Sequence, residues 1–276
     1  MNTDIPYVFD AHVQPDERLQ DAILYYHLER ALEGRLVPCS FLNAPPSGGV
    51  WGMDRSGLLH GRREMAQAAY ANIDVLAAVG GCIIPAAHVA QKIATSPDQG
   101  MTIRNLKDPL GSLRHMQPGD DSTAHLRSIG VTRDDPVVIH PDFDLRHVRR
   151  FMVVAGKITC ESPMMFQIDL ANTPGDDFRD LQVDASGNHF IDGDMAWRDK
   201  QHAAAEALLS AYPLPCGAID VGLHEDEGEI RARIDCVISA PPGGLFPYMA
   251  DMARHAAKIA EYVDELAPVL LDEMAP

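Results

Sequence analysis

LPCGAIDVGLHEDEGEIRARIDCVISAPPGGLFPY, the stretch Leu214–Tyr248, carries the clearest structural pattern in the sequence. Two apolar runs, Cys216–Leu223 and Ile230–Ser239, flank the acidic segment Glu225–Glu229. The β-branched residues of the two runs favour extended strands, and Gly228 supplies the conformational freedom of a tight turn. The pattern predicts a β-hairpin that is followed by a loop rich in proline and glycine.

Each predicted strand of this hairpin carries one aspartate, Asp220 in the first and Asp235 in the second. Two carboxylates on paired strands beside a glycine loop are suited to hold a hard cation such as Mg²⁺ against phosphate oxygens. The alternative is a hairpin whose aspartates point to water, and residue types alone favour that alternative.

The composition places the chain among soluble globular proteins. It has 276 residues, of which 46% are hydrophobic and 23% are charged, a length that permits one large domain or two ordinary ones. No apolar run approaches the ~20 residues that span a bilayer. The polar, acidic N-terminus resembles neither a signal peptide nor a transit peptide, so we expect a cytoplasmic protein.

Charge and cysteine usage exclude several further classes. The net charge of −17 disfavours nucleic acid and anionic membranes as partners. A local basic cluster is either an anion site or a set of charges that offset neighbouring acids; its members are Arg146, His147, Arg149 and Arg150. The five cysteines form no CxxC pair, which argues against a zinc ribbon or a disulfide framework and fits reduced, mostly buried thiols.

Common catalytic motifs are missing from the sequence. The glycine pairs that begin at Gly48, Gly80 and Gly243 form neither a GxGxxG nor a Walker A pattern. No HxH or HExxH spacing supports a histidine zinc site, and no GxSxG elbow is present. These absences disfavour a Rossmann site, a P-loop, a zinc enzyme and an α/β-hydrolase.

Hydrophobic periodicity predicts an α+β protein that opens with a β–α–β unit. The predicted strands outside the hairpin are Tyr7–Phe9, Arg35–Leu42, Cys82–Ile84, Met101–Arg104, Pro136–Ile139 and two within Arg149–Ser162. The predicted helices are Asp16–Glu33, Arg62–Val79, Ala86–Ala94, Arg198–Tyr212 and Pro247–Glu273. The C-terminal sheet should be mostly antiparallel, and the segment Asp98–Asp135, rich in Gly, Pro, Asp and Ser, should be a mobile loop.

Three segments resemble the ATP-grasp superfamily, in particular its small ATP-grasp-like domains. They are PVVIHP at 136–141, RRFMVVAGKI at 149–158 and the stretch 218–248, and the resemblance spans roughly residues 136–270. It implies a small α/β N-terminal domain, residues 1–84, followed by a two-lobed ATP-grasp-like region, residues 85–276. The central lobe would comprise residues 85–140 and the C-terminal lobe residues 141–276.

The resemblance further implies an ATP-dependent ligase that joins a carboxylate to an amine or a thiol through an acyl phosphate, with ATP and Mg²⁺ as cofactors. Its substrates would be small-molecule or peptide carboxylates and amines. Arg150 matches the arginine that contacts phosphate or the acyl phosphate, and Asp220 matches the first metal ligand, with Asp235 as the second. The strand that meets adenine would comprise Val138, Ile139 and His140, and the phosphate-binding cation of the central lobe would be Lys107, Arg104 or Lys92.

The sequence also departs from the family pattern. The second acid with its following Asn aligns either with Asp235-Cys-Val or, one position along, with Cys236-Val-Ile, so the amide ligand is missing. His140 stands where a Glu is common, and Val148 stands where an acid usually precedes the arginine. These departures motivate an alternative function, a pseudoenzyme or binding protein that has lost phosphoryl transfer. A third alternative is an assembly protein that forms a homodimer through its apolar C-terminal helix.

Overall fold

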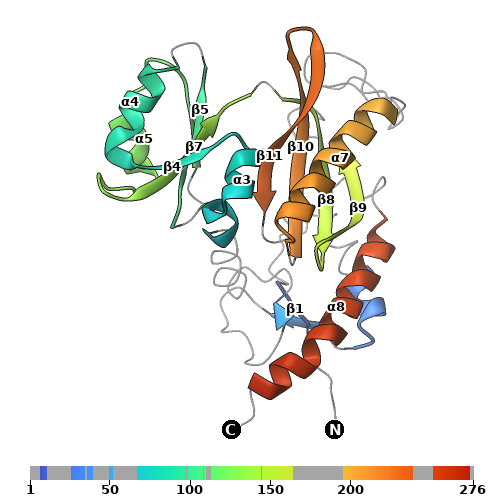
Figure 1. The fold of residues 1–276 in the computed structure, drawn as a ribbon. Helices are drawn as coiled ribbons and strands as arrows, with labels where there is room; N and C mark the ends of the chain where they lie inside the picture. Colours follow the sequence, from blue (N-terminus) through green and yellow to red (C-terminus); the bar gives the residue numbers. More distant parts are fainter. Residues whose placement is uncertain are drawn as a thin grey trace, which may run out of the picture.

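The computed structural model describes residues 7–10, 26–34, 36–39, 50–51, 67–96, 99–107, 109, 113–143, 145–163, 195–214, 216–238 and 251–273. Three β-sheets organise this part of the chain, and helices cover the two larger sheets (Figure 1). The α+β class that the sequence predicts is confirmed. No helix among these residues is long and apolar enough to cross a membrane.

The first sheet, the N-terminal sheet, has the strand order β2-β1-β3. Its strands are β1 (Tyr7–Asp10), β2 (Leu36–Cys39) and β3 (Val50–Trp51). β1 pairs with β2 in parallel, and a helix at residues 26–31 lies between them in the sequence. A parallel pair needs such a crossover, so the predicted β–α–β unit is confirmed.

The second sheet, the central sheet, has the order β4-β7-β5-β6, and all its pairings are antiparallel. Its strands are β4 (Cys82–Pro85), β5 (Met101–Asn105), β6 (Leu113–Met116) and β7 (Pro136–Pro141). One face packs against the short helices η1 (Ala86–His88), α4 (Val89–Ala94) and α5 (Ser122–Ser128). Val138, on the opposite face, belongs to a core cluster that also contains residues of the C-terminal sheet.

The third sheet, the C-terminal sheet, is antiparallel with the order β11-β10-β8-β9. Its strands are β8 (Arg146–Val154), β9 (Lys157–Pro163), β10 (Cys216–Asp226) and β11 (Glu229–Ile238). The predicted hairpin is thus confirmed, and residues Glu227 and Gly228 turn the chain with positive φ values of 51° and 81°. Positive φ at both central residues matches the right-handed twist of two-residue hairpins.

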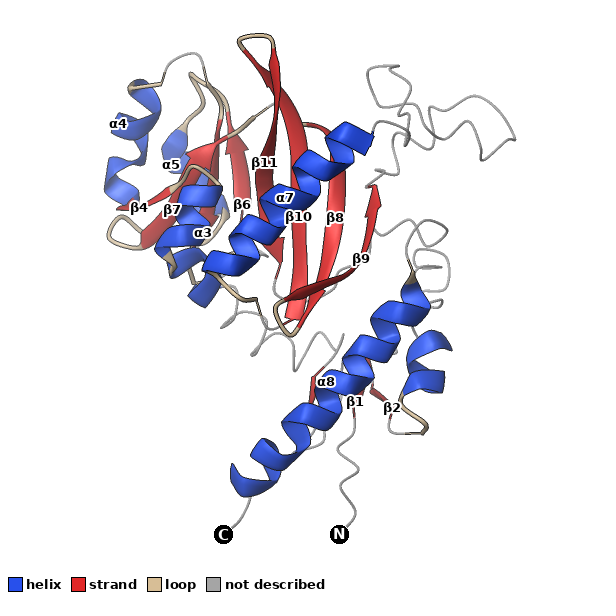
Figure 2. Ribbon diagram, turned by 45° about the vertical axis from the view of Figure 1, so that its right-hand side comes forward, coloured by secondary structure: helices blue, strands red, loops and turns tan. Residues whose placement is uncertain are grey.

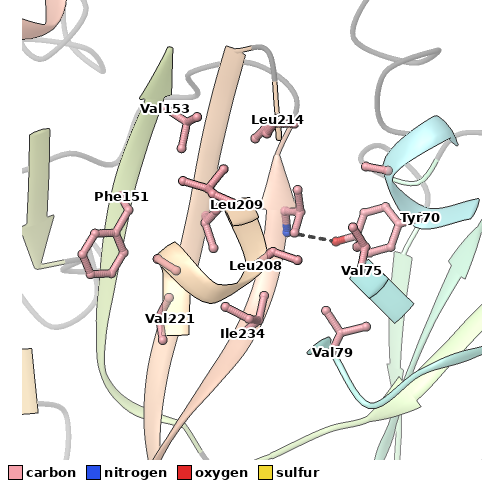
Figure 3. Packing of buried hydrophobic residues seen from close by; sticks show 14 of the residues in the cluster. Tyr70, Val75, Val79, Phe151, Val153, Leu208, Leu209, Leu214, Val221 and Ile234 are labelled. Atoms are coloured by element: carbon pink, nitrogen blue, oxygen red, sulfur yellow. Dashed lines mark hydrogen bonds between the residues drawn. The ribbon is translucent and has the colours of Figure 1, made fainter. Parts of the chain in front are cut away.

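One long helix crosses one face of this sheet (Figure 2), and the N-terminal part of another packs on the opposite face. α7 (Met195–Ala211) packs Ala205, Leu208 and Leu209 on one face, where they meet Phe151 and Val153 of β8 (Figure 3). α8 (Met252–Glu273) packs its described apolar residues against the other face; these are Met252, Ala256, Ile259 and Ala260. The apolar stripe of α8 that motivated the dimer alternative is covered, over these residues, by the chain's own sheet and the helix at 26–31.

Three expectations from the sequence need correction. The predicted helix Arg62–Val79 is interrupted, because the Asn72 side chain accepts hydrogen bonds from the Asp74 and Val75 amides and starts α3 (Ile73–Ala78). The predicted mobile loop contains β6 and α5, which Asp121 caps. The predicted domain boundary after residue 84 falls inside β4, whose pairing with β7 assigns that strand to the central sheet.

The segment that connects β7 of the central sheet to β8 of the C-terminal sheet packs closely on β10 at Leu145. Opposite Gly222, β8 contains the two residues His147 and Val148, and His147 has a φ of 50°. This irregularity brings the connecting segment onto Gly222, where an added Cβ atom would lie 2.7 Å from the Leu145 Cβ atom. Only a residue without a side chain fits there, so Gly222 helps to place β10 relative to the central sheet.

We expect Gly222→Ala to lower the free energy of unfolding by about 1–3 kcal/mol, because the added methyl group overlaps Leu145. Urea unfolding of the variant measures this loss. Adding Leu145→Gly, which removes the Cβ atom that the new methyl group meets, should reverse much of the effect, so that the two substitutions are strongly non-additive. If Gly222→Ala lowers the free energy of unfolding equally in the wild type and in the variant that is substituted at residue 145, the packing argument is contradicted.

His255 of α8 is fully buried, and its Nδ1 atom lies 2.7 Å from the Thr159 Oγ1 atom. Burial lowers the pKa of this imidazole from 6.5 to about 4. Since the folded pKa lies below the unfolded one, the unfolded chain takes up the proton first as the pH falls. The contribution of the buried, neutral His255 to the free energy of unfolding is therefore complete above about pH 6.5. It is lost progressively as the pH falls from 6.5 to 4.

We expect His255→Gln to remove this contribution to acid sensitivity. The loss of unfolding free energy between pH 7 and pH 4 should be smaller in the variant by about 3 kcal/mol, since each pKa unit corresponds to about 1.4 kcal/mol. Urea unfolding at several pH values gives the slope for both proteins. The same slope in the variant and the wild type would show that His255 does not titrate in this window.

Candidate functional site

A buried ion pair joins two strands of the C-terminal sheet. Arg150 on β8 lies directly opposite Asp220 on β10. The arginine Nε and Nη2 atoms donate to the Asp220 Oδ1 and Oδ2 atoms, each at 2.7 Å, and both side chains are only 5% exposed. The two-point geometry matches the planar guanidinium to the planar carboxylate, which makes this a strong and directional interaction.

The ion pair offsets the effect of burial on the Arg150 guanidinium. Burial by itself lowers the pKa of the Arg150 guanidinium, but the hydrogen bonds and the negative charge of Asp220 outweigh it, so the pKa is raised. The predicted phosphate-binding arginine and the predicted first metal ligand are thus neighbours. In the structure they neutralise each other.

Strand alternation separates Arg149 from Arg150. Arg149 points to the α7 face, where its Nη1 atom lies 3.5 Å from the Glu161 Oε1 atom. Glu161 also pairs with Arg198 and His202 of α7. Arg149 and Arg150 of the basic cluster therefore lie on opposite faces of the sheet, and on the α7 face Arg149 is offset by Glu161.

A β-bulge determines the position of Asp235. Asp220 pairs with Cys236 and Val221 pairs with Ile234, so Asp235 is the extra residue on β11. Burial and the nearby Asp220 raise the pKa of Asp235, whereas the charge of Arg104 lowers it. Asp235 thus lies within electrostatic reach of the predicted first metal ligand, although Cys236 occupies the position opposite that ligand.

Arg104 approaches this site from the central sheet. On β5 it lies opposite Val138 of β7, on the face turned away from α4 and α5. Its Nε atom lies 3.5 Å from the His140 Nε2 atom, and its guanidinium stacks over the Tyr70 ring at 5.1 Å from the centroid. Burial lowers the pKa of Arg104, but nearby Cys236, among other groups, raises it, and the net shift is upward.

His140 is a neutral partner of Arg104. Burial and the charge of Arg104 lower the pKa of this imidazole to about 4. The Nδ1 atom lies 3.1 Å from the Pro141 carbonyl oxygen. A neutral ring that donates from Nδ1 to this carbonyl leaves Nε2 free to accept from Arg104, which assigns the tautomer.

The other predicted site residues lie elsewhere. The Lys107 Nζ atom pairs with the Asp135 Oδ1 atom at 2.6 Å, and its side chain is 65% exposed. Lys92 is exposed on α4, on the far side of the central sheet. Ile139 packs in the core beneath α4 and α5, whereas Val138 points the opposite way. Of the three predicted cations, Arg104 is the one turned toward the C-terminal sheet.

Residues of the site that sequence reasoning missed are Tyr70 and Cys236. The Tyr70 hydroxyl oxygen lies 3.5 Å from the Cys236 Sγ atom, and burial raises the pKa of this thiol. Cys236 lies one position after Asp235 in the stretch that resembles the family, but no pattern marked it as a neighbour of Tyr70. Tyr70 lies in an alanine-rich helical pattern that gave no signal that its hydroxyl would meet a polar site.

The donor set suits a magnesium ion that also binds phosphate. Among the described residues no three His, Cys, Asp or Glu side chains form a metal cluster. Mg²⁺, however, is usually held by one or two carboxylates together with substrate phosphates and water. Asp220 and Asp235 supply two oxygen-donor groups whose mutual repulsion a cation would relieve.

Comparison with known proteins identifies the fold. No protein-family model matches the sequence, and no curated protein does. Among solved structures, D-cycloserine synthetase DcsG is similar with a TM-score of 0.58 and 16% identity, over 94% of this chain and 99% of that one. D-Alanine–D-alanine ligase from Bacillus anthracis has a TM-score of 0.54 and 12% identity, over 98% and 99% of the two chains.

A RimK domain protein from Sphaerobacter thermophilus, described as an ATP-grasp, has a TM-score of 0.52 and 14% identity, over 93% of this chain and 98% of that one. Identities this low establish the fold alone. The ATP-grasp fold that the sequence resemblance predicts is confirmed, and the chain is a divergent example of it.

Proposed function

We propose that this chain, which has the fold of ATP-grasp ligases, binds Mg·ATP between its central and C-terminal sheets and activates a carboxylate for ligation. The observation that carries the proposal is the convergence of groups from both sheets. Arg104 and His140 come from the central sheet, and Arg150, Asp220 and Asp235 come from the C-terminal sheet. Phosphoryl transfer depends mainly on positioning and charge neutralisation, which such a set supplies.

Each group has a role that fits its chemistry. Arg104 is a buried cation for the nucleotide phosphates. β7 is paired on both sides at Val138, so adenine would meet this strand at His140, beyond the end of its pairing with β4. Arg150 contacts the transferred phosphoryl group. Asp220 and Asp235 would hold Mg²⁺, which when bound neutralises charge on the β- and γ-phosphates.

The proposed reaction has two steps. A carboxylate oxygen of the first substrate attacks the γ-phosphorus, an O–P bond forms, and ADP leaves with the electrons of the broken bond. An amine or thiol of the second substrate then attacks the acyl carbon. Inorganic phosphate leaves, and the nucleophile loses a proton. The substrates would be small-molecule or peptide carboxylates and amines.

The comparisons support the nucleotide part of this proposal. D-Alanine–D-alanine ligase from Bacillus anthracis, in its complex with ATP, is similar with a TM-score of 0.53 and 13% identity, over 98% of this chain and 99% of that one. ATP is thus the ligand of a protein with the same fold.

The test is ADP release from Mg·ATP in the presence of a panel of carboxylic acids, each combined with an amine or a thiol. We expect ADP formation with at least one pair, and its loss in Asp220→Asn, which keeps the shape of the side chain. Asp226→Asn, at an exposed ion pair with Arg231, is the matched control and should remain active. Turnover that is unchanged in Asp220→Asn would contradict the site.

A second function, a nucleotide-binding pseudoenzyme, is favoured by one observation. The residue two positions after Asp235, where the family has its amide ligand, is Val237, and its side chain packs in the core beneath α7. No oxygen donor stands at that position. Binding of ATP without ADP formation for any acceptor pair would select this function over the ligase.

A further inference from the structure

Tyr70 links the two sheets on which the proposed site is built. It lies in the helix at residues 67–71, and its side chain is fully buried. Its hydroxyl accepts a hydrogen bond from the Val237 amide at 3.2 Å, shown by the dashed line in Figure 3. The Arg104 guanidinium carbon lies over its ring, 5.1 Å from the ring centroid. One side chain therefore contacts both a strand of the C-terminal sheet and a cation of the central sheet.

The Tyr70 hydroxyl provides a hydrogen-bond partner for the backbone of β11. β11 is the edge strand of its sheet, so the backbone groups on its outer side lack a strand partner. The Val237 amide follows the bulge residue Asp235 by two positions. Burial raises the pKa of the Tyr70 hydroxyl well above its usual range, so the group stays protonated. It can then accept from the Val237 amide and also donate to the Cys236 Sγ atom at 3.5 Å.

The ring contact holds Arg104. A guanidinium over an aromatic face is attracted by the electron density of the ring, most strongly where water is excluded. Arg104 is 4% exposed and has the Cys236 thiol beside it, and its hydrogen bonds to His140 and to the Pro109 carbonyl oxygen are 3.5 and 3.3 Å long. These are long contacts, so the ring is an important restraint on the guanidinium.

We propose that Tyr70 is a positioning residue of the nucleotide site, which fixes the bulge that carries Asp235 through its hydroxyl and the Arg104 guanidinium through its ring. The inference rests on the proposed binding of Mg·ATP between the sheets. A metal ligand and a phosphate-binding cation on separate sheets must keep a fixed separation to act on one nucleotide. Tyr70 contacts the strand that carries the first and the guanidinium of the second.

Two variants separate the two contacts. Tyr70→Phe removes the hydroxyl and keeps the ring, so the Mg²⁺ concentration for half-maximal ATP binding should rise about 10-fold, the effect expected when a partner that orients a ligand is lost. The affinity for ATP without Mg²⁺ should change by less than about twofold. Tyr70→Leu removes both contacts and should weaken ATP binding about 10-fold without Mg²⁺ as well.

The matched control is Tyr26→Phe. Tyr26 is exposed, and its hydroxyl accepts a hydrogen bond from Arg30, whose guanidinium lies 5.5 Å from the ring centroid. It therefore makes the same two kinds of contact as Tyr70, a hydroxyl hydrogen bond and a ring contact with an arginine, but away from the site. Binding is measured by titration calorimetry well below the melting temperature of each variant. A purely structural role of Tyr70 would lower the melting temperature and leave these affinities unchanged.

The outcomes distinguish the inference from its premise. Wild-type protein that binds no ATP, with or without Mg²⁺, overturns both the proposed function and this inference. Wild-type protein that binds Mg·ATP, with both Tyr70 variants within about twofold of it, overturns the inference alone. Should Tyr70→Leu fail to fold, the Mg²⁺ dependence of Tyr70→Phe decides the question.

Discussion

Asp220→Ala should lower the free energy of unfolding by about 3–5 kcal/mol, because it leaves the Arg150 guanidinium buried without its partner carboxylate. The cost comes from the buried guanidinium charge and from its Nε and Nη2 donors, which lose the carboxylate that they bind. Urea unfolding at neutral pH measures the change. Because of this loss, an alanine variant is a poor test of catalysis, and the isosteric Asp220→Asn serves that purpose better.

Two comparisons make the prediction specific. The double variant Arg150→Met/Asp220→Leu replaces the pair by apolar side chains of similar size and should recover most of the lost stability. Arg231 and Asp226 form an ion pair of the same 2.7 Å length, but their side chains are 45% and 38% exposed. Asp226→Ala should therefore cost less than about 1 kcal/mol. A small effect of Asp220→Ala, similar to that of Asp226→Ala, would contradict the buried ion pair.

The double variant Asp220→Asn/Asp235→Asn should abolish the Mg²⁺-dependent part of ATP binding. Both proposed oxygen-donor carboxylates lose their charge, while their size and one acceptor oxygen each remain. At an ATP concentration 100 times the wild-type dissociation constant, ligand binding stabilises a protein by about 2.7 kcal/mol. A 100-fold loss of affinity would leave about 0.4 kcal/mol of this stabilisation.

Thermal unfolding of the double variant with ATP, with and without Mg²⁺, measures that loss. Asp226→Asn is again the control, since it removes a carboxylate from the tip of the same hairpin, beyond the proposed site. A melting temperature that rises equally with Mg·ATP in the double variant and the wild type would exclude these two aspartates as metal ligands.

The parts of the fold that depend on local pattern could be predicted from the sequence. Alternating apolar runs around Glu227 and Gly228 produce the β10–β11 hairpin, and the opening β–α–β unit follows from its periodicity. The segment at 98–135 was misassigned because its many turn residues concealed β6 and α5. Each of these elements is short, and their stability comes from packing on the central sheet rather than from local propensity.

The site itself was only partly predictable. The family resemblance named Arg150 and Asp220 as separate site residues, and their contact with each other is seen only in the structure. The bulge at Asp235 was not predictable, because a one-residue change of register has no signature in the apolar alternation around it. Tyr70 was missed since its contacts depend on how two sheets meet, which no motif encodes.

The central claim is that the described groups of the two sheets together bind Mg·ATP. The most direct measurement is the thermal unfolding of the wild-type protein with ATP and with ADP, each with and without Mg²⁺. At a nucleotide concentration about 100 times the dissociation constant, we predict a rise in melting temperature of about 5–10 °C with Mg·ATP. The rise should be clearly smaller with ATP alone. An unchanged melting temperature under all four conditions would contradict the account.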